Sequence, residues 1–224
     1  SSPLVVGARV IVPAGGAPEG ARAGLVAYDA ASGALLWTSP PRHFSYASPS
    51  LGRLHGRELV LAVNEDSLSA HALADGALLF EHPWHGRTSG DASASQARVL
   101  DDEHVFVSKG YGVGAALLRI AQQDGRLAAS VVWHAPRLLR TKFTNVVVDG
   151  GFVYGLDDGF LECVELATGA RRWKAGRYGH GQILAVGDTL LVLAEDGVVS
   201  AVALAPQREN ELFWSFQALE EKCW

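Results

Sequence analysis

Hydrophobic and polar positions alternate most regularly between residues 144 and 173, where the chain predicts four short β-strands. The expected strands are residues 144–148, 152–156, 160–165 and 170–173, each of the length that strands prefer in globular proteins. The segments between them are Asp149-Gly150-Gly151, Asp157-Asp158-Gly159 and Thr168-Gly169, and such pairs supply the positive φ of tight hairpin turns. This stretch therefore predicts an up-and-down antiparallel sheet, which needs neighbouring sheets to bury its apolar faces.

The same pattern recurs along the chain, and an aromatic residue ends each unit. These residues, roughly 40 to 53 positions apart, are Trp37, Phe80, Trp133, Trp173 and Trp214. We therefore expect four-stranded units at about residues 1–40, 41–86, 87–136, 137–176 and 177–219, with 220–224 starting a further unit. A Gly/Ala/Pro-rich insertion at 15–24 extends the first unit, and segments 109–114 and 121–128 lengthen the third. Four strands per repeat of this length are typical of a β-propeller, in which each unit is a blade.

Two segments carry a more specific motif, AYDAASGALLW at residues 27–37 and VELATGARRW at residues 164–173. In each segment an Asp or a Glu lies before a turn and a Gly lies within it. The Trp that ends the segment is expected to fill the space between adjacent blades. The motif resembles the tryptophan-docking repeat of the pyrroloquinoline-quinone-like (PQQ-like) propellers, which include quinoprotein dehydrogenases and the propeller lipoprotein of outer-membrane protein assembly.

The resemblance covers the whole chain and implies an all-β propeller of four-stranded antiparallel blades. About five blades are expected here, as an open arc from a propeller of seven or eight. The five aromatic residues that end the units are expected to pack between blades. By resemblance, we also expect a periplasmic or otherwise exported protein.

Composition and charge narrow the classes of partner. The chain is 48% hydrophobic and 19% charged, which is usual for a compact core. Its net charge is -5, and no basic run is longer than Arg171-Arg172, so a nucleic-acid partner is not expected. No apolar stretch approaches the roughly 18 residues of a membrane span. The two cysteines, Cys163 and Cys223, predict neither a disulfide framework nor a metal-binding pair.

The remaining chemical motifs have structural explanations, so we expect no catalytic residues, no metal and no cofactor. By resemblance, quinone-binding members carry an adjacent cysteine pair and calcium ligands, which this chain lacks. The acidic pairs at 101–102, 157–158 and 195–196 fall where hairpins need turn residues. The glycines of 110–114 predict a hairpin loop rather than a phosphate loop, because no helix follows. Neither His82-Pro83-Trp84-His85 nor the serines of 45–50 and 89–95 form a recognisable metal site or hydrolase elbow.

Candidate binding residues lie in the connections from the outer strand of one blade to the inner strand of the next, because loops on a rigid scaffold often bind ligands. They are His43, Tyr46, Arg140, Lys142, Asn145, Tyr178 and His180. These loops are equally compatible with simple solvation, and Asn145 with a stabilising bond to a neighbouring blade.

The expected function is a non-enzymatic scaffold that binds a protein or peptide. The alternatives are a fragment of a quinoprotein dehydrogenase, a propeller that binds a sugar or other small molecule, and a structural arm of a larger protein. Apolar faces of the terminal blades would also allow self-association.

Overall fold

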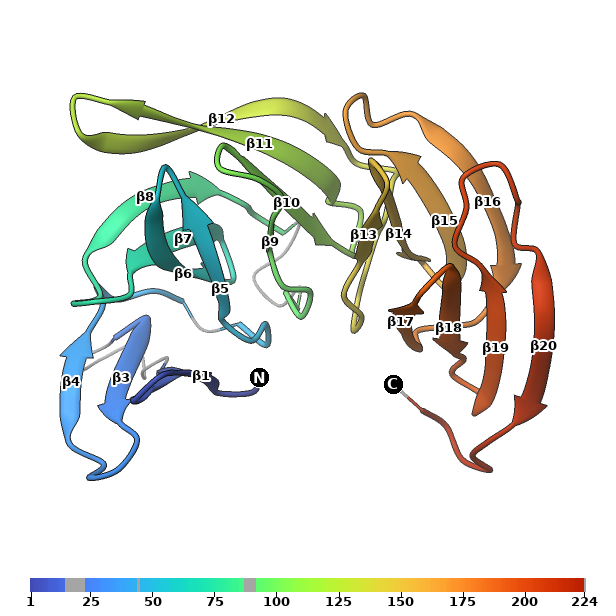
Figure 1. Ribbon diagram of the computed structural model, residues 1–224, viewed down its shortest axis with the longest axis horizontal. Coiled ribbons are helices and arrows are strands. Elements are labelled where there is room, and N and C mark those ends of the chain that lie inside the picture. Colours follow the sequence, from blue (N-terminus) through green and yellow to red (C-terminus); the bar gives the residue numbers. More distant parts are fainter. Residues whose placement is uncertain (15–22, 44, 87–91, 224) are drawn as a thin grey trace. The chain divides into compact units, whose positions relative to one another are not determined.

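Five four-stranded antiparallel sheets form the part of the protein that the structure describes, in agreement with the predicted all-β class. The computed structural model describes residues 1–14, 23–43, 45–86 and 92–223. In each sheet the strands pair in the order in which they follow along the chain (Figure 1). This up-and-down pairing is the simplest way to join antiparallel strands through short turns, so every sheet is a separate blade.

The strand bounds define the five blades. Blade 1 comprises β1 (Leu4–Val6), β2 (Arg9–Pro13), β3 (Leu25–Asp29) and β4 (Leu35–Thr38). Blade 2 comprises β5 (Ser50–Leu54), β6 (Arg57–Val63), β7 (Ser67–Ala72) and β8 (Leu78–Pro83). Blade 3 comprises β9 (Arg98–Val99), β10 (His104–Lys109), β11 (Gly114–Gln123) and β12 (Arg126–Ala135). Blade 4 comprises β13 (Val147–Asp149), β14 (Phe152–Asp157), β15 (Phe160–Glu165) and β16 (Arg171–Arg177). Blade 5 comprises β17 (Gln182–Val186), β18 (Thr189–Leu193), β19 (Val198–Ala203) and β20 (Leu212–Gln217).

Blade 3 departs from the sequence prediction. Residues 121–128 are expected to lengthen the unit between two strands, but they belong to those strands, because β11 and β12 continue to the turn at residues 124–125. The strands meet at Asp124 and Gly125, whose φ values of 49° and 77° suit a tight two-residue hairpin. The Asp-Gly turn therefore lengthens the hairpin instead of interrupting it. Residues 15–22 of the predicted insertion in blade 1 lie outside the described residues.

The chain folds as two compact units, residues 1–107 with 117–132 and residues 108–116 with 133–224. In the first, Trp37 packs with Ile11 and Ala27 of its own blade and with Val60 and Leu73 of blade 2. In the second, a cluster around Trp173 joins blades 4 and 5; its other members include Leu161, Cys163, Leu190, Val202 and Leu204. Each core therefore joins adjacent blades.

A tryptophan docked on the next blade's turn is the repeated contact. Trp37 Nε1 donates to the carbonyl of Leu73 (3.2 Å), and the ring lies against Gly76, where a Cβ would be 2.5 Å from the indole. Trp133 Nε1 donates to Leu166 O (2.8 Å), and a Cβ on Gly169 would be 2.9 Å from that ring. In both cases the carbonyl lies three positions before the glycine, so the same turn receives the indole twice.

The outer-strand aromatic also has a fixed place in its own blade. It pairs with the neighbouring strand as Ala27 with Trp37, Ala70 with Phe80, Cys163 with Trp173, and Ala201 with Trp214, and each pair is followed by a register shift. Such a bulge re-aims the strand end and increases its twist. These four aromatic side chains therefore leave their blades from equivalent positions.

Burial differs among these aromatics. Trp37, Phe80 and Trp173 are buried, whereas Trp214 is 48% exposed. Phe80 has no ring N–H to donate, so blade 2 cannot repeat the hydrogen bond made by Trp37. A buried outer-strand aromatic that also donates a hydrogen bond to the next blade is thus present in only some of the repeats.

We expect Trp37→Ala to lower the free energy of unfolding by about 3–5 kcal/mol, because it opens a cavity between blades 1 and 2 and removes a hydrogen bond. Chemical denaturation checks this value. Trp214→Ala is the matched control and should cost far less, since Trp214 is half-exposed. Equal losses for the two variants would contradict the docking role of Trp37.

A second expectation concerns the turn glycines. Gly76→Ala and Gly33→Ala both place alanine at a positive φ, 74° and 71°, which costs about 1–2 kcal/mol. Only Gly76→Ala also pushes a Cβ into Trp37, whereas no atom lies within 4 Å of a Cβ at Gly33. We therefore expect Gly76→Ala to lose about 1–3 kcal/mol more than Gly33→Ala in denaturant unfolding. A smaller loss at Gly76 would show that the turn does not hold the indole.

Candidate functional site

The loop between β4 and β5 carries the two most accessible candidates, His43 and Tyr46. The side chain of His43 is 62% exposed, with Nδ1 3.6 Å from the Glu65 carboxylate. Tyr46 is 60% exposed. Both side chains are therefore more than half exposed to solvent, while residue 44 lies outside the described part of the loop.

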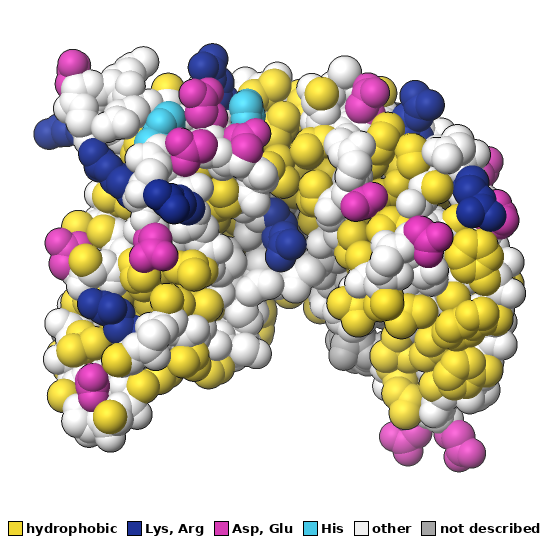
Figure 2. Space-filling model, in the orientation of Figure 1, with side chains coloured by type: hydrophobic (Ala, Val, Ile, Leu, Met, Phe, Trp, Pro, Cys, Tyr) yellow, Lys and Arg dark blue, Asp and Glu magenta, His cyan; other side chains and the backbone are white. Residues whose placement is uncertain are grey.

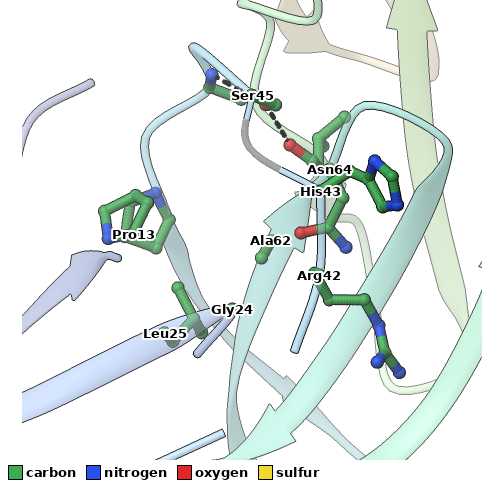
Figure 3. Close-up of a pocket in the computed structure, with 11 residues that line it drawn as sticks. Pro13, Gly24, Leu25, Arg42, His43, Ser45, Ala62 and Asn64 are labelled. Carbon is green, nitrogen blue, oxygen red and sulfur yellow. Dashed lines mark hydrogen bonds between the residues drawn. The ribbon is translucent and has the colours of Figure 1, made fainter. Parts of the chain in front are cut away.

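A buried serine fixes the chain between these two side chains (Figure 3). Ser45 Oγ lies within hydrogen-bond distance of the Val63 carbonyl and 3.0 Å from the Ser93 carbonyl, and it accepts the N–H of Ala47 (3.1 Å). The hollow beneath the loop, lined among others by Pro13, Leu25, Ala62 and Asn64, has a free volume of only about 10 Å³. That is room for one water molecule, so the loop is packed against blades 1 and 2 rather than covering a ligand cavity.

A wider, open hollow of about 460 Å³ lies beside this loop. Its lining residues are Pro41, Arg42, His43, Asp66, Ser67, Glu81, Pro83 and His85. Arg42 is held by Glu81, with Nε 2.7 Å from a carboxylate oxygen. The surface thus combines a fixed ion pair, two imidazoles and proline rings. Among the described residues, no three His, Cys, Asp or Glu side chains are grouped to bind a metal ion.

In the second unit, Arg140 and Lys142 are engaged in ion pairs. Arg140 binds Asp157 through Nε (2.8 Å) and Nη2 (2.9 Å), and its backbone N–H donates to the same carboxylate (2.7 Å). Lys174 Nζ also bonds to Asp157. Lys142 Nζ lies 2.9 Å from Asp158 and 5.7 Å from the ring of Tyr111. Arg140 and Lys142 therefore anchor the β12–β13 loop to the end of β14 and to the turn that follows it.

Two buried carboxylates in this unit have opposite pKa shifts. Burial would raise the pKa of Asp157, but hydrogen bonds from Arg140 and Lys174 outweigh it and lower the pKa below its ordinary value. Burial also raises the pKa of Glu162. The hydrogen bonds from the Leu139 N–H and the Arg171 guanidinium lower that pKa by less, so it stays above its ordinary value. Asp157 is therefore a stable anion, whereas Glu162 is held less firmly in its charged form.

The β12–β13 and β16–β17 loops lie together and gather further candidates. The Phe143 and His180 rings meet edge to face at 5.9 Å, and Gln182 Nε2 donates to the Phe143 carbonyl (2.9 Å). The N–H of His180 donates to Glu195 (3.0 Å), and Tyr178 OH donates to Asn210 Oδ1 (2.7 Å). Tyr178 and His180 are half-buried in these contacts.

Asn145 is exposed on the adjoining loop. A second open hollow, of about 540 Å³, lies beside Tyr178 and is lined by Arg177, Gly179, Glu195, Asp196, Glu220, Glu221 and Lys222. Residues 220–223 belong to the segment expected to lead into a further blade, and Lys222 Nζ pairs with Glu195 (2.6 Å). The segment therefore contacts the β18–β19 turn of blade 5.

The sequence interpretation did not identify the residues that contact the candidate cations Arg140 and Lys142. Asp157 is read as a turn residue, yet it is fully buried and bound by two cations. Gly110 is explained as part of a loop, and the structure adds a steric reason, because a Cβ there would be 2.6 Å from the Lys142 side chain. The available signal was the alternation in β14, which places Asp157 on the same face as Val153 and Gly155.

We expect Asp157→Asn to lower the free energy of unfolding at pH 7 by about 3–5 kcal/mol, because it leaves Arg140 and Lys174 without their buried anion. Because folding lowers the pKa of Asp157, its stabilisation is fully present above the unfolded pKa of about 3.9. It is lost as the pH falls through the folded pKa. The difference between wild type and variant should therefore shrink below about pH 4 in denaturation at several pH values.

Asp158→Asn is the matched control for that series. Its carboxylate is 41% exposed and pairs with Lys142, so its removal should cost only about 0.2–1 kcal/mol. A gap between wild type and Asp157→Asn that stays constant down to pH 2 would contradict the assigned ionisation.

Comparisons with solved structures agree with the blade architecture. The chain matches the computationally designed Ika8 protein with a TM-score of 0.65 and 11% identity, over 98% of this chain and 62% of that one. It matches BamB from Moraxella catarrhalis with a TM-score of 0.63 and 19% identity, over 96% of this chain and 59% of that one. The chain thus spans about three fifths of the length of these structures, and the likeness identifies the β-propeller fold.

A search of curated protein sequences found no significant match. Among the residues described, no helix could cross a membrane. The model of one protein family, described as outer membrane protein assembly factor BamB, matches residues 1–175. This range includes the motif-bearing segments that end in Trp37 and Trp173 and covers most of the sequence. The chain therefore belongs to this family of PQQ-like repeat propellers.

Proposed function

We propose that this propeller domain is a non-enzymatic scaffold that binds a protein or peptide partner in the periplasm or another exported compartment. The observation that carries the proposal is the match of residues 1–175 to a family described as an assembly factor for outer membrane proteins. A role in assembly requires contact with other proteins, and it needs no reacting side chains. The exported location rests on the same family description.

The β4–β5 loop is the proposed contact surface. Tyr46 offers a large, half-polar ring at low entropic cost, and tyrosine often dominates the energetics of interfaces. Ser45 anchors the backbone beside it, so little order has to be gained when a partner binds. An exposed aromatic on a fixed loop is the arrangement that favours protein recognition.

The adjoining 460 Å³ hollow suits a polypeptide better than an apolar small molecule. Small-molecule sites are lined mainly by hydrophobic side chains and enclose most of the ligand. This hollow is open and carries Arg42, Glu81 and Asp66 together with His43 and His85. Such a mixture can pair with the charges and amides of an extended peptide.

The second unit is the weaker alternative surface. Arg140 and Lys142 already pair with Asp157 and Asp158, so a partner would have to compete with these carboxylates. Asn145 and His180 remain candidates for secondary contacts at the neighbouring loops.

We expect a photoreactive amino acid at position 46 to cross-link this protein to a specific partner in cells, whereas the same group at position 131 should not. Val131 is a suitable control because it is also about half-exposed but lies on strand β12. With the partner identified, Tyr46→Ala should weaken binding at least tenfold, a loss of about 1.4 kcal/mol, because it removes the exposed ring. The melting temperature of the variant should stay unchanged.

Equal cross-linking at positions 46 and 131 would contradict the proposed surface. Loss of binding together with a lowered melting temperature would assign Tyr46 a structural role instead. A saturable calorimetric response to a panel of sugars, abolished by Tyr46→Ala, would favour the small-molecule alternative over the scaffold.

A further inference from the structure

A fully buried histidine lies beside the contact between blades 1 and 2. His71, on β7, has no exposed surface, and it pairs across the sheet with Val60, which packs in the same apolar cluster as Trp37. In Figure 2 the histidine side chains that reach the visible face lie among acidic side chains at the surface. Those histidines can take up a proton in contact with water, whereas His71 would have to hold the charge inside the protein.

The equivalent position of blade 4 holds an apolar residue. The two turns that receive an indole have the same backbone bond, because the N–H groups of Gly76 and Gly169 each donate to the carbonyl four positions earlier, at 2.9 Å. Counting back five positions from these glycines gives His71 in blade 2 and Val164 in blade 4, and both side chains are fully buried. The docking of an indole on the turn therefore does not require a titratable side chain at this position.

The hydrogen bonds of His71 suit the neutral ring. Its Nδ1 lies 3.1 Å from the Gly76 carbonyl, which can only accept, so Nδ1 carries the proton. In a neutral imidazole Nε2 is then an acceptor, and the hydroxyl of Ser69 donates to it at 2.9 Å. Ser69 Oγ in turn accepts an N–H from Asn64 Nδ2 (3.0 Å), which also donates to Ser67 Oγ (3.1 Å). The bonds therefore run in one direction, from the Asn64 amide to the Gly76 carbonyl.

A proton added at Nε2 is incompatible with this direction. The ring would then present an N–H to Ser69, so the serine hydroxyl would lose its acceptor, and an unpaired buried polar group costs free energy. Burial also disfavours the charged ring directly and is the main reason why the pKa of His71 lies below its ordinary value of 6.5. The bond from Nδ1 to the Gly76 carbonyl favours the charged ring but offsets this effect only in part.

The charged groups around His71 do not compensate its burial. Glu81 on β8 favours the protonated ring, but Arg42 opposes it, and these two side chains are bound to each other, with Arg42 Nε 2.7 Å from the carboxylate. Asp75, in the turn itself, is exposed and accepts the N–H of Ala77 (3.0 Å). Of these two carboxylates, one is therefore paired with a guanidinium and the other lies at the surface, and neither stabilises a buried imidazolium.

We propose that His71 makes the contact between blades 1 and 2 sensitive to acid, because a proton on its ring favours an open state in which the Gly76 turn separates from Trp37. The two events are directly connected, since the His71 ring binds the carbonyl of the glycine on which the indole packs. The β4–β5 loop joins the same two blades, so the separation would also displace the loop that carries Tyr46. This response belongs to the interface between the blades and does not depend on a partner.

The response has a defined pH range. Because the closed state holds His71 with a lowered pKa, the open state binds a proton first as the pH falls below about 6.5. The contact is therefore fully stable above that pH and weakens as the pH falls, until the closed state is protonated as well. Between pH 7.5 and pH 5 the opening constant can rise by at most about 30-fold, which is the protonation factor of a freely exposed imidazole.

Hydrogen exchange measured by mass spectrometry on the whole chain tests the proposal. We expect peptides that cover residues 70–78 to open roughly 3- to 30-fold more often at pH 5 than at pH 7.5, after correction for the intrinsic exchange rate. The Gly169 turn, at residues 163–171, is the internal control, because Val164 does not titrate. Folding raises the pKa of the neighbouring Glu162, so acid should not make this control turn open more often.

Two variants remove the titrating group. His71→Val installs the residue that blade 4 uses, and His71→Gln keeps an amide that can still bond to Ser69 and Gly76. Each variant should lose most of the difference between pH 5 and pH 7.5 at residues 70–78, whatever its stability at neutral pH. His55→Gln is the matched control and should keep the wild-type response, because His55 lies in the same blade, is partly exposed and bonds through Nε2 to the Ile120 carbonyl (2.7 Å).

Several results would overturn the proposal. Exchange at residues 70–78 that is the same at both pH values would show that the contact does not respond to acid. An acid response that persists in the His71 variants, or that disappears in His55→Gln, would assign it to another group. A wild-type response that is equally large at residues 163–171 would indicate general acid unfolding instead of opening between blades 1 and 2.

Discussion

The stacking of an indole on a turn glycine is the contact that joins a blade to the next one where Trp37 meets Gly76 and Trp133 meets Gly169. Gly76 meets two independent requirements. Its backbone adopts a positive φ of 74°, and its lack of a side chain leaves room for the Trp37 ring to pack against it. Any side chain would fail the second requirement even if the backbone accepted it. Because a four-stranded sheet cannot bury its faces alone, this contact and the apolar packing around it make the blades mutually stabilising.

Much of this architecture could be predicted from the sequence because it is local. The predicted strands at 152–156 and 160–165 agree with β14 and β15 to within one residue. The alternation of side chains and the Gly-containing turns determine such segments within a few residues. The β11–β12 hairpin was the exception, because residues 121–128 were placed between two strands as added length rather than within them. Backbone pairing across the hairpin extends both strands into these residues.

The site was harder to predict, because its chemistry depends on contacts between distant positions. Sequence alone identified Arg140 and Lys142 as cations in a loop, but their partners are Asp157, the last residue of β14, and Asp158 in the turn that follows it. The pairing removes these cations from the most accessible candidates. It leaves His43 and Tyr46, whose exposure depends on how Ser45 bonds to carbonyls on two other segments. No local pattern encodes such tertiary hydrogen bonds.

The order of the strands has a consequence for how the protein forms. Every sheet pairs strands that are neighbours in sequence, so a blade can be completed as soon as its own residues have emerged during synthesis. Docking then runs in one direction along the chain, because the indole of an earlier blade needs the turn of the next. Each newly folded blade therefore covers the apolar face of the preceding blade. The growing polypeptide exposes only one such face at a time to chaperones and to aggregation.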